Sequence, residues 1–167
     1  MSGLDVSRLT PADCVAALRS YPRRFRAALS AIGDDDSAEE RAHRVGTDGR
    51  SAVDHVDHVV RAFDALGQAV HQILVDDSPT LTPAVLDDSA REHPVGSQQR
   101  LDSVLDAVTA ECGRLADVVE RVDTDAWTRT GLVGDRKVTA LDVVREAVRL
   151  GAEALRAAEA AFKAASR

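Results

Sequence analysis

Apolar residues recur at alternating steps of three and four along four stretches of the chain, and polar segments containing proline or glycine separate these stretches. This spacing places the apolar side chains on one face of an α-helix. It predicts helices over about 10–32, 51–75, 98–122 and 139–162. The clearest stripe, in the second stretch, consists of Val53, Val56, Val60, Phe63, Gly67, Val70 and Leu74. We therefore expect an all-α four-helix bundle.

Capping signals mark the starts of three of these helices. Thr10, Ser51 and Thr139 each directly precede an apolar stripe, and threonine and serine are good N-cap residues. Asp54 follows Ser51 by three residues, where its charge favours the positive end of the helix dipole. Pro22 lies inside the first stripe, between Leu18 and Phe25, and predicts a kink or a break.

The segments between the stripes predict loops of different lengths. Segment 34–49 is acidic and has no sustained apolar period, so we expect a loop in which His43 is exposed. Segment 76–97 contains three prolines and predicts a long crossover between the second and third helices, passing over one end of the bundle. The crossover is either a topological connection or a lid. After the third helix we expect a turn in which Trp127 seals the bundle end or stacks on a ligand.

Length and composition agree with one helical domain over 1–167. A chain of 167 residues can bury roughly 70% of its unfolded surface, so it needs no disulfide or metal to stabilise a core. Cys14 and Cys112 have neither metal-ligand nor redox-motif spacing, and we expect reduced thiols that fill core volume. Aromatic residues make up only 3% of the chain, which suits aliphatic helix seams better than a β-sandwich.

Charge and hydropathy exclude several classes of partner. The formal charge of −7 opposes non-specific attraction to nucleic acid and to anionic lipid. The chain has no run of 18 apolar residues, and no basic segment followed by an apolar run at its start. We therefore expect a cytoplasmic protein that contacts neither nucleic acid nor membrane.

The best candidates for chemistry are two histidines near the start of the second helix. His55 and His58 lie one turn apart at one border of the apolar stripe, whereas His71 lies at the opposite border. Side chains at such a border can face a cleft between helices, and bundles commonly place metal sites between helices. Histidines at i and i+3 are also common in helices that bind nothing.

The order of these features resembles the DinB/YfiT-like superfamily. The resemblance rests on four helices in sequence, His58 early in the second helix, the Trp-Thr-Arg-Thr-Gly turn at 127–131 and the Val138-Thr139 entry to the last helix. It covers nearly the whole chain and implies the superfamily's four-helix fold. In this superfamily three histidines typically bind a divalent metal, and members include thiol-dependent transferases and isomerases, hydrolases and many proteins of unknown activity.

The resemblance places the metal site only in part. The histidine of the second helix falls on His58, and the paired positions of the last helix fall on Arg149 and Glu153. Arginine stays protonated and opposes a cation, so the site is expected to be degenerate. His58, Glu153 and a neighbour, His55 or Asp54, form the remaining candidate ligand set for zinc or nickel.

Other features of the sequence favour a metal-free protein. Gly49-Arg50 replaces the tryptophan that often precedes the second-helix motif in this superfamily. Arg149 has Glu146 and Glu153 one helical turn away on either side, where it can form ordinary ion pairs on a helix surface. On this reading, the cleft that holds the metal in this superfamily is remodelled in this chain rather than left empty.

Two functional hypotheses follow. The first is a metal-free binding or interaction module for a small-molecule or protein ligand. The alternative is a divalent-metal-dependent thiol transferase or hydrolase. We also expect a homodimer, because the last helix has surplus alanines beside its stripe, namely Ala147, Ala154, Ala157 and Ala161.

Overall fold

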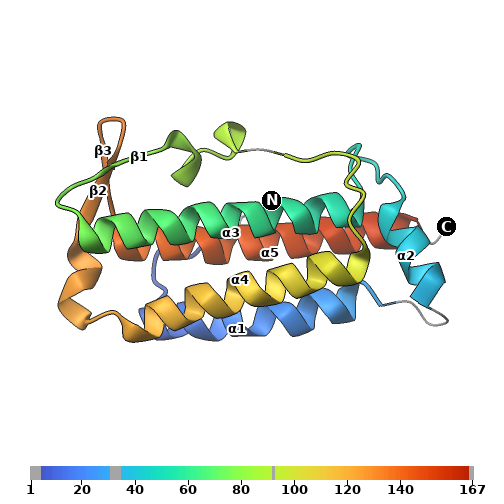
Figure 1. Ribbon diagram of the computed structural model, residues 1–167, viewed down its shortest axis with the longest axis horizontal. Helices are drawn as coiled ribbons and strands as arrows, with labels where there is room; N and C mark the ends of the chain where they lie inside the picture. Colours follow the sequence, from blue (N-terminus) through green and yellow to red (C-terminus); the bar gives the residue numbers. More distant parts are fainter. Residues whose placement is uncertain (1–4, 31–34, 92, 166–167) are drawn as a thin grey trace.

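Four long helices form the bundle in the computed structural model, which describes residues 5–30, 35–91 and 93–165 (Figure 1). They are α1 (Pro11–Ala28), α3 (Ala52–Val75), α4 (Leu101–Arg121) and α5 (Ala140–Ala164). α3 packs against α5 and α4, and α1 packs against the same two helices, so the four surround a common core. The predicted four-helix bundle is therefore confirmed.

Local sequence explains where these helices begin. Thr10, Ser51 and Thr139 are the N-caps of α1, α3 and α5, and each forms a reciprocal capping box with an aspartate three residues later. α4 begins at Leu101 rather than 98, and its first amide N–H donates to the Glu39 carboxylate at 2.9 Å. Among the described residues, no helix combines the length and apolarity needed to cross a bilayer.

The predicted stripe of α1 includes Pro22, whereas the structure buries the neighbouring residue Tyr21 in its place and leaves Pro22 half-buried. Of the other apolar positions that the spacing assigns to this stripe, Val15 is half-buried and Ile32 lies outside the described residues. The helix continues through Pro22, so the predicted break is absent. Tyr21 and Phe25 hold the helix against the core on either side of the proline, and the Tyr21 hydroxyl donates to the Val148 carbonyl of α5 at 2.6 Å.

Segment 34–49 is not entirely a loop, because it contains helix α2 (Asp35–His43). Its apolar content is low, and pairs of side chains one turn apart support it: His43 Nε2 lies 3.1 Å from Glu39 Oε1, and Arg44 pairs with Glu40. His43 is half-buried and paired, so the prediction that it is simply exposed is wrong. Ala42 is completely buried and fastens α2 to the bundle.

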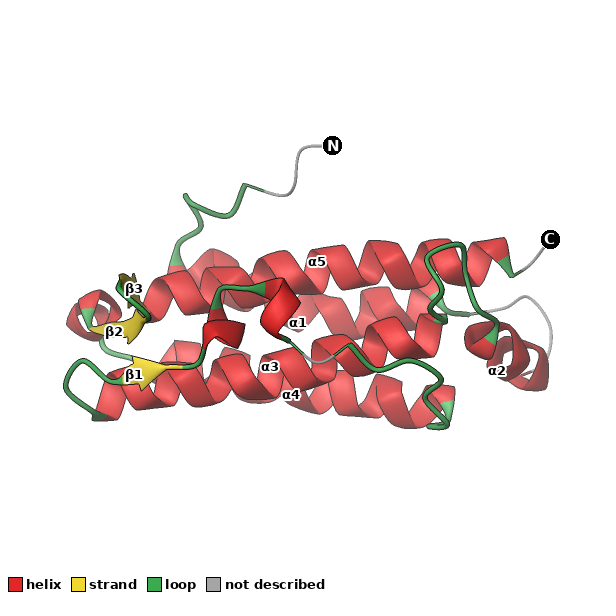
Figure 2. Cartoon of the chain, turned by 90° about the horizontal axis from the view of Figure 1, so that it is seen from above, coloured by secondary structure: helices red, strands yellow, loops and turns green. Residues whose placement is uncertain are grey.

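The crossover runs along the bundle rather than over one end (Figures 1 and 2). It leaves the end of α3 through β1 (Thr80–Leu81) and continues through the short 3-10 helices η1 (Pro83–Val85) and η2 (Asp88–Ala90). It reaches the start of α3 again at Ser97, whose amide N–H donates to Asp54 Oδ1 at 2.8 Å. The crossover therefore covers one side of α3.

A small sheet closes the bundle end, an addition to the all-α prediction. After η3 (Thr124–Thr128), which contains the buried Trp127, the chain forms a hairpin of β2 (Thr130–Val133) and β3 (Arg136–Thr139). β1 pairs with β2 in parallel, which gives the order β1-β2-β3. Gly131 lies close to Leu81 and Ile73, where an added Cβ would come within 2.9 Å of Leu81 Cδ1. The sheet thus packs directly on the end of α3.

Candidate functional site

A polar cavity lies where the first turns of α3 face α5 and the crossover. Its volume is about 170 Å³. It is lined by Arg50, His55, His58, Asp88, His93, Leu150, Glu153, Ala154 and Ala157. The structure thus brings together all three candidate ligands that the sequence indicated, namely His55, His58 and Glu153, and adds residues of the crossover.

His58 is buried beneath the crossover, with 10% of its side chain exposed. Its ring stacks on that of His93, with centroids 4.2 Å apart and planes inclined by 18°. Asp88 faces both rings, because its Oδ1 lies 3.7 Å from His58 Nε2 and its Oδ2 lies 3.7 Å from His93 Nε2. One carboxylate of η2 is therefore shared by two stacked imidazoles.

Hydrogen bonds determine the protonation of His93. Arg50 Nη1 donates to His93 Nδ1 at 2.9 Å, and a guanidinium can only donate. His93 Nε2 must then carry the proton, which it donates to the Asp88 carbonyl oxygen at 2.9 Å. Both nitrogens of this neutral imidazole are therefore used by the protein.

His55 has a buried nitrogen that lacks a directed partner. His55 Nε2 lies 2.9 Å from Asp48 Oδ2, within ion-pair distance. The carboxylate does not meet the directional requirement of a hydrogen bond, and within the described part of the chain Nε2 has no hydrogen-bond partner. Burial lowers the pKa of His55, with Asp48 opposing the shift. His55 therefore lines the cavity with a ring whose Nε2 atom is buried and has no hydrogen-bond partner among the described residues.

A chain of ion pairs occupies the α5 side of the site. The Arg149 guanidinium donates to both Glu146 oxygens, at 2.8 and 2.6 Å, and to Glu153 Oε2 at 2.6 Å. Arg91 of the crossover, whose side chain is 5% exposed, donates to Glu146 Oε1 at 2.8 Å. These bonds raise the pKa of Arg149, chiefly through Glu146, and keep its charge permanent.

The metal set implied by the DinB/YfiT resemblance does not fit these residues. Arg149 offers no lone pair, and its positive charge stands where a histidine ligand would be needed. Glu153 is already neutralised by Arg149 at 2.6 Å. Asp54, the alternative neighbour, serves as the α3 cap instead: although burial opposes the shift, amide donors from Ser51 and Ser97 hold its pKa below the usual range.

A second donor set, His58, Asp88 and His93, has ligand atoms within 4.8 Å of one another. A metal bound to imidazole lies in the plane of the ring, along the nitrogen lone pair. Two rings stacked at 4.2 Å and inclined by only 18° share no such point within bonding distance. Binding would also break one of the two hydrogen bonds of His93, so this arrangement does not fit a metal without rotation of the rings.

Sequence reasoning missed Asp48, Asp88 and His93, which complete the site. All three lie in connections between long helices, where no periodicity relates them to α3. For Arg50 the sequence indicates only a departure from a tryptophan that is frequent in the superfamily. The sequence signal available was the placement of Asp88 and His93 within one short polar segment, which does not reveal its partner helix.

Comparison with known proteins establishes the fold. No protein-family model matches the sequence, and no curated protein sequence matches it. Among solved structures, YfiT from Bacillus subtilis, described as a probable metal-dependent hydrolase with an unusual four-helix bundle topology, aligns with a TM-score of 0.70. The alignment covers 94% of this chain and 86% of YfiT at 15% identity. The predicted resemblance is confirmed at the level of the fold.

Proposed function

We propose that this protein is a metal-free binding module, and that the cavity between α3, α5 and the crossover receives a small polar ligand. The observation that carries the proposal is the Arg149 guanidinium, which pairs with Glu146 and Glu153 at the positions where the resemblance implies metal ligands. A permanent cation there opposes a divalent metal. It also pairs with Glu153, the carboxylate at one of the two positions where the resemblance implies a histidine of the last helix.

The cavity has the features of a small-molecule site. Its lining combines the apolar residues Leu150, Ala154 and Ala157 with polar side chains from Arg50, the histidines, Asp88 and Glu153. His58 also borders a second cavity of about 250 Å³ between α3 and the crossover. His58 therefore lines both cavities, while one face of its ring is covered by His93.

Elemental metal analysis of untagged protein tests the absence of a metal. We expect no stoichiometric zinc, nickel or manganese in the wild type, in His58→Ala, or in His71→Ala, whose histidine is exposed on α3 outside this cavity. The double variant Arg149→His, Glu153→His restores the family's histidine pattern and is expected to gain metal. Stoichiometric metal in the wild type that is lost in His58→Ala but kept in His71→Ala would overturn the proposal.

Ligand binding is tested with a panel of small polar molecules, using the melting temperature and amide chemical shifts as readouts. A ligand of this cavity is expected to shift amides of α3, α5 and η2, and to lose affinity in His58→Ala but not in His71→Ala. Binding that is equal in both variants would place the ligand elsewhere.

A metal-dependent thiol transferase or hydrolase is the second candidate. The proximity of His58, Asp88 and His93, which could hold a metal if the two rings rotated apart, supports it, together with the description of YfiT as a probable metal-dependent hydrolase. Its test is a panel of thiol and ester substrates with added divalent metals. Metal-dependent turnover that falls in both His58→Ala and Asp88→Asn would establish this candidate in place of the first.

Self-association stays a prediction, but the alanines of α5 no longer support it. Ala147, Ala154 and Ala161 are buried within the bundle and Ala157 is half-buried, so these alanines allow close packing of α5 inside one chain. Light scattering at micromolar concentration would measure the mass of the protein in solution, and a monomeric mass would contradict a dimer.

A further inference from the structure

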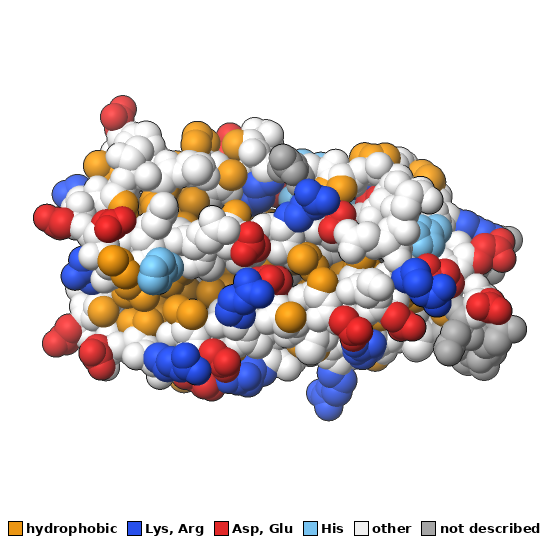
Figure 3. All heavy atoms as spheres, viewed as in Figure 1, with side chains coloured by type: hydrophobic (Ala, Val, Ile, Leu, Met, Phe, Trp, Pro, Cys, Tyr) orange, Lys and Arg blue, Asp and Glu red, His pale blue; other side chains and the backbone are white. Residues whose placement is uncertain are grey.

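An apolar groove lies between α3 and α4, separate from the two cavities that His58 lines. Its volume is about 420 Å³, within the range of roughly 300–1,000 Å³ typical of small-molecule pockets. Its floor is apolar and consists of Phe63, Gly67, Leu115 and Val118. Figure 3 shows apolar side chains at the surface between these helices. Nothing in the proposed function uses this groove.

Gly67 keeps the groove open. A Cβ built at Gly67 meets no atom within 4 Å, so the space above the α3 backbone is free. Phe63 and Leu115 are nearly completely buried on either side and form a packed base rather than a loose surface. A ligand can therefore reach the middle of the groove without moving the core.

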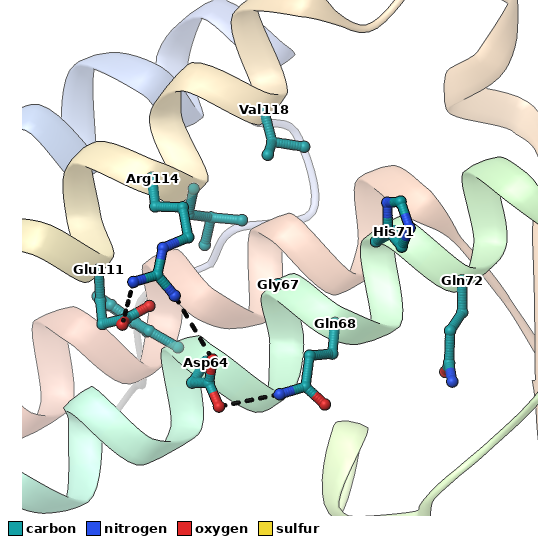
Figure 4. Close-up of a pocket in the computed structure, with 10 residues that line it drawn as sticks. Asp64, Gly67, Gln68, His71, Gln72, Glu111, Arg114 and Val118 are labelled. Atoms are coloured by element: carbon teal, nitrogen blue, oxygen red, sulfur yellow. Dashed lines mark hydrogen bonds and ion pairs between the residues drawn. The ribbon is translucent and has the colours of Figure 1, made fainter.

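Charged side chains close one end of the groove (Figure 4). Arg114 reaches across from α4, with Nη2 3.1 Å from Glu111 Oε1 and Nη1 3.6 Å from Asp64 Oδ1 on α3. Gln68 donates to the other Asp64 oxygen at 2.9 Å. Two carboxylates thus face one guanidinium, which leaves this end with a net charge of about −1 at neutral pH.

The two carboxylates and the guanidinium differ in exposure. The Glu111 side chain is 14% exposed, whereas those of Arg114 and Asp64 are 62% and 51% exposed. Burial raises the pKa of Glu111, and Arg114 compensates only in part. A cation held closer to Glu111 and out of water would stabilise its ionised form more than the exposed guanidinium does.

We propose that this groove binds a small amphipathic amine, with the apolar body on Phe63, Gly67, Leu115 and Val118 and the ammonium group between Asp64 and Glu111. Arg114, largely in water, swings outward when the ammonium group enters. An anionic ligand meets two carboxylates at this end, and a neutral one gains no charge-assisted hydrogen bond.

Three probe molecules of similar shape but different charge test the proposal. The probes are 3-phenylpropylamine, 3-phenylpropanol and 3-phenylpropionate, titrated into the full chain and followed by amide chemical shifts. We expect the amine to shift amides of α3 and α4 around Gly67 and Leu115. Its affinity should exceed that of the alcohol by roughly tenfold, and the propionate should bind most weakly.

Four variants, one of them a control, test whether binding depends on the groove and on its charge. Gly67→Leu fills the groove and should abolish binding of the amine, whereas Gly113→Leu, a glycine of α4 that also has open space, should not. Glu111→Gln keeps the shape of the groove. It should lower the affinity for the amine about tenfold while leaving the affinity for the alcohol unchanged. Arg114→Gln removes the guanidinium that competes for the two carboxylates, so it should raise the affinity for the amine.

Several outcomes would overturn the proposal. These are equal affinity for the three probes, shifts located away from α3 and α4, or full binding by a folded Gly67→Leu variant. A concentration-dependent dimer that Gly67→Leu abolishes would instead assign the groove to a second copy of the chain. Metal content and the effect of His58→Ala are independent of all these outcomes.

Discussion

At the residue scale, burial determines the chemistry of the two cysteines. Cys14 and Cys112 are completely buried in α1 and α4, as the sequence predicted. Burial raises the pKa of Cys14 to about 11 and that of Cys112 to about 12, so almost no thiolate is present at neutral pH. We predict that iodoacetamide leaves both thiols unmodified in the native protein and labels both in denaturing urea. Rapid labelling of either cysteine without unfolding would contradict the packing described.

His55 should make stability depend on pH. Burial lowers its pKa below the ordinary value of about 6.5, so the unfolded state binds more protons than the folded state as the solution becomes acidic. This contribution to stability is fully present above about pH 6.5 and is lost as the pH falls toward the folded-state pKa.

The test measures the free energy of unfolding by urea between about pH 7 and pH 5. We predict that His55→Gln flattens the decline seen in the wild type over this interval. His71→Gln, which changes an exposed histidine outside the cavity, is the control. Equal flattening in both variants would show that His55 is not the source.

The helix pair α1 and α5 provides a prediction at the scale of elements. Gly151 lies against Tyr21, and an added Cβ would come within 2.5 Å of Tyr21 Cε2. Tyr21 cannot retreat easily, because it is 1% exposed and its hydroxyl is bonded to Val148. We predict that Gly151→Ala lowers the free energy of unfolding by about 1–3 kcal/mol.

Gly113→Ala is the matched control, since a Cβ there meets no atom within 4 Å. Removing a glycine from the middle of a helix without a clash should stabilise the protein by about 0.5–1 kcal/mol. Urea denaturation of both variants measures the difference. A stabilising Gly151→Ala would mean that α1 and α5 pack less closely than the structure shows.

A helix or strand could be predicted from the sequence where neighbouring residues along the chain determine it. α1, α3 and α5 were recognisable because stripe and cap agree at Thr10, Ser51 and Thr139. The hairpin has a signal in the sequence, because Gly134-Asp135 separates the two short runs that form β2 and β3, but this signal alone indicates a turn and not the paired strands. α2 had no apolar stripe: besides its pairs of side chains one turn apart, it is held by Ala42 in the core and by Glu39 accepting from the first amide of α4, which are contacts between distant segments.

At the scale of the whole molecule, the order of helices was predictable, but the path of the crossover and the composition of the site were not. The stripes specify four helices and their seams, whereas three prolines indicate only that segment 76–97 is not a long helix. Its course along α3 depends on Arg91, Asp88 and His93 finding partners on α3 and α5. The candidate site therefore could be predicted on the α3 side and not on the crossover side.

The same contacts predict that the crossover opens separately from the bundle. Arg91 holds it by donating to the carbonyls of Ala84 and Val85 and to Glu146 on α5, all within 3.0 Å. The crossover has few buried apolar side chains of its own, chiefly Leu81 and Val85. Local opening of this segment then costs less free energy than unfolding of the four helices.

Native-state hydrogen exchange tests this arrangement in wild type and Arg91→Met. We predict that the amides of Leu86 and Asp87, which donate to Pro83, lose protection by roughly tenfold in Arg91→Met, while amides in the middle of α3 and α5 keep theirs. Arg19→Met removes an exposed arginine that pairs with Asp117 and Glu120, and should leave the crossover unchanged. If Arg91→Met lowers the protection of α3 and α5 equally, the crossover is part of the cooperative bundle and does not open separately. If only the crossover responds, Arg91 controls access to the cavity around His58.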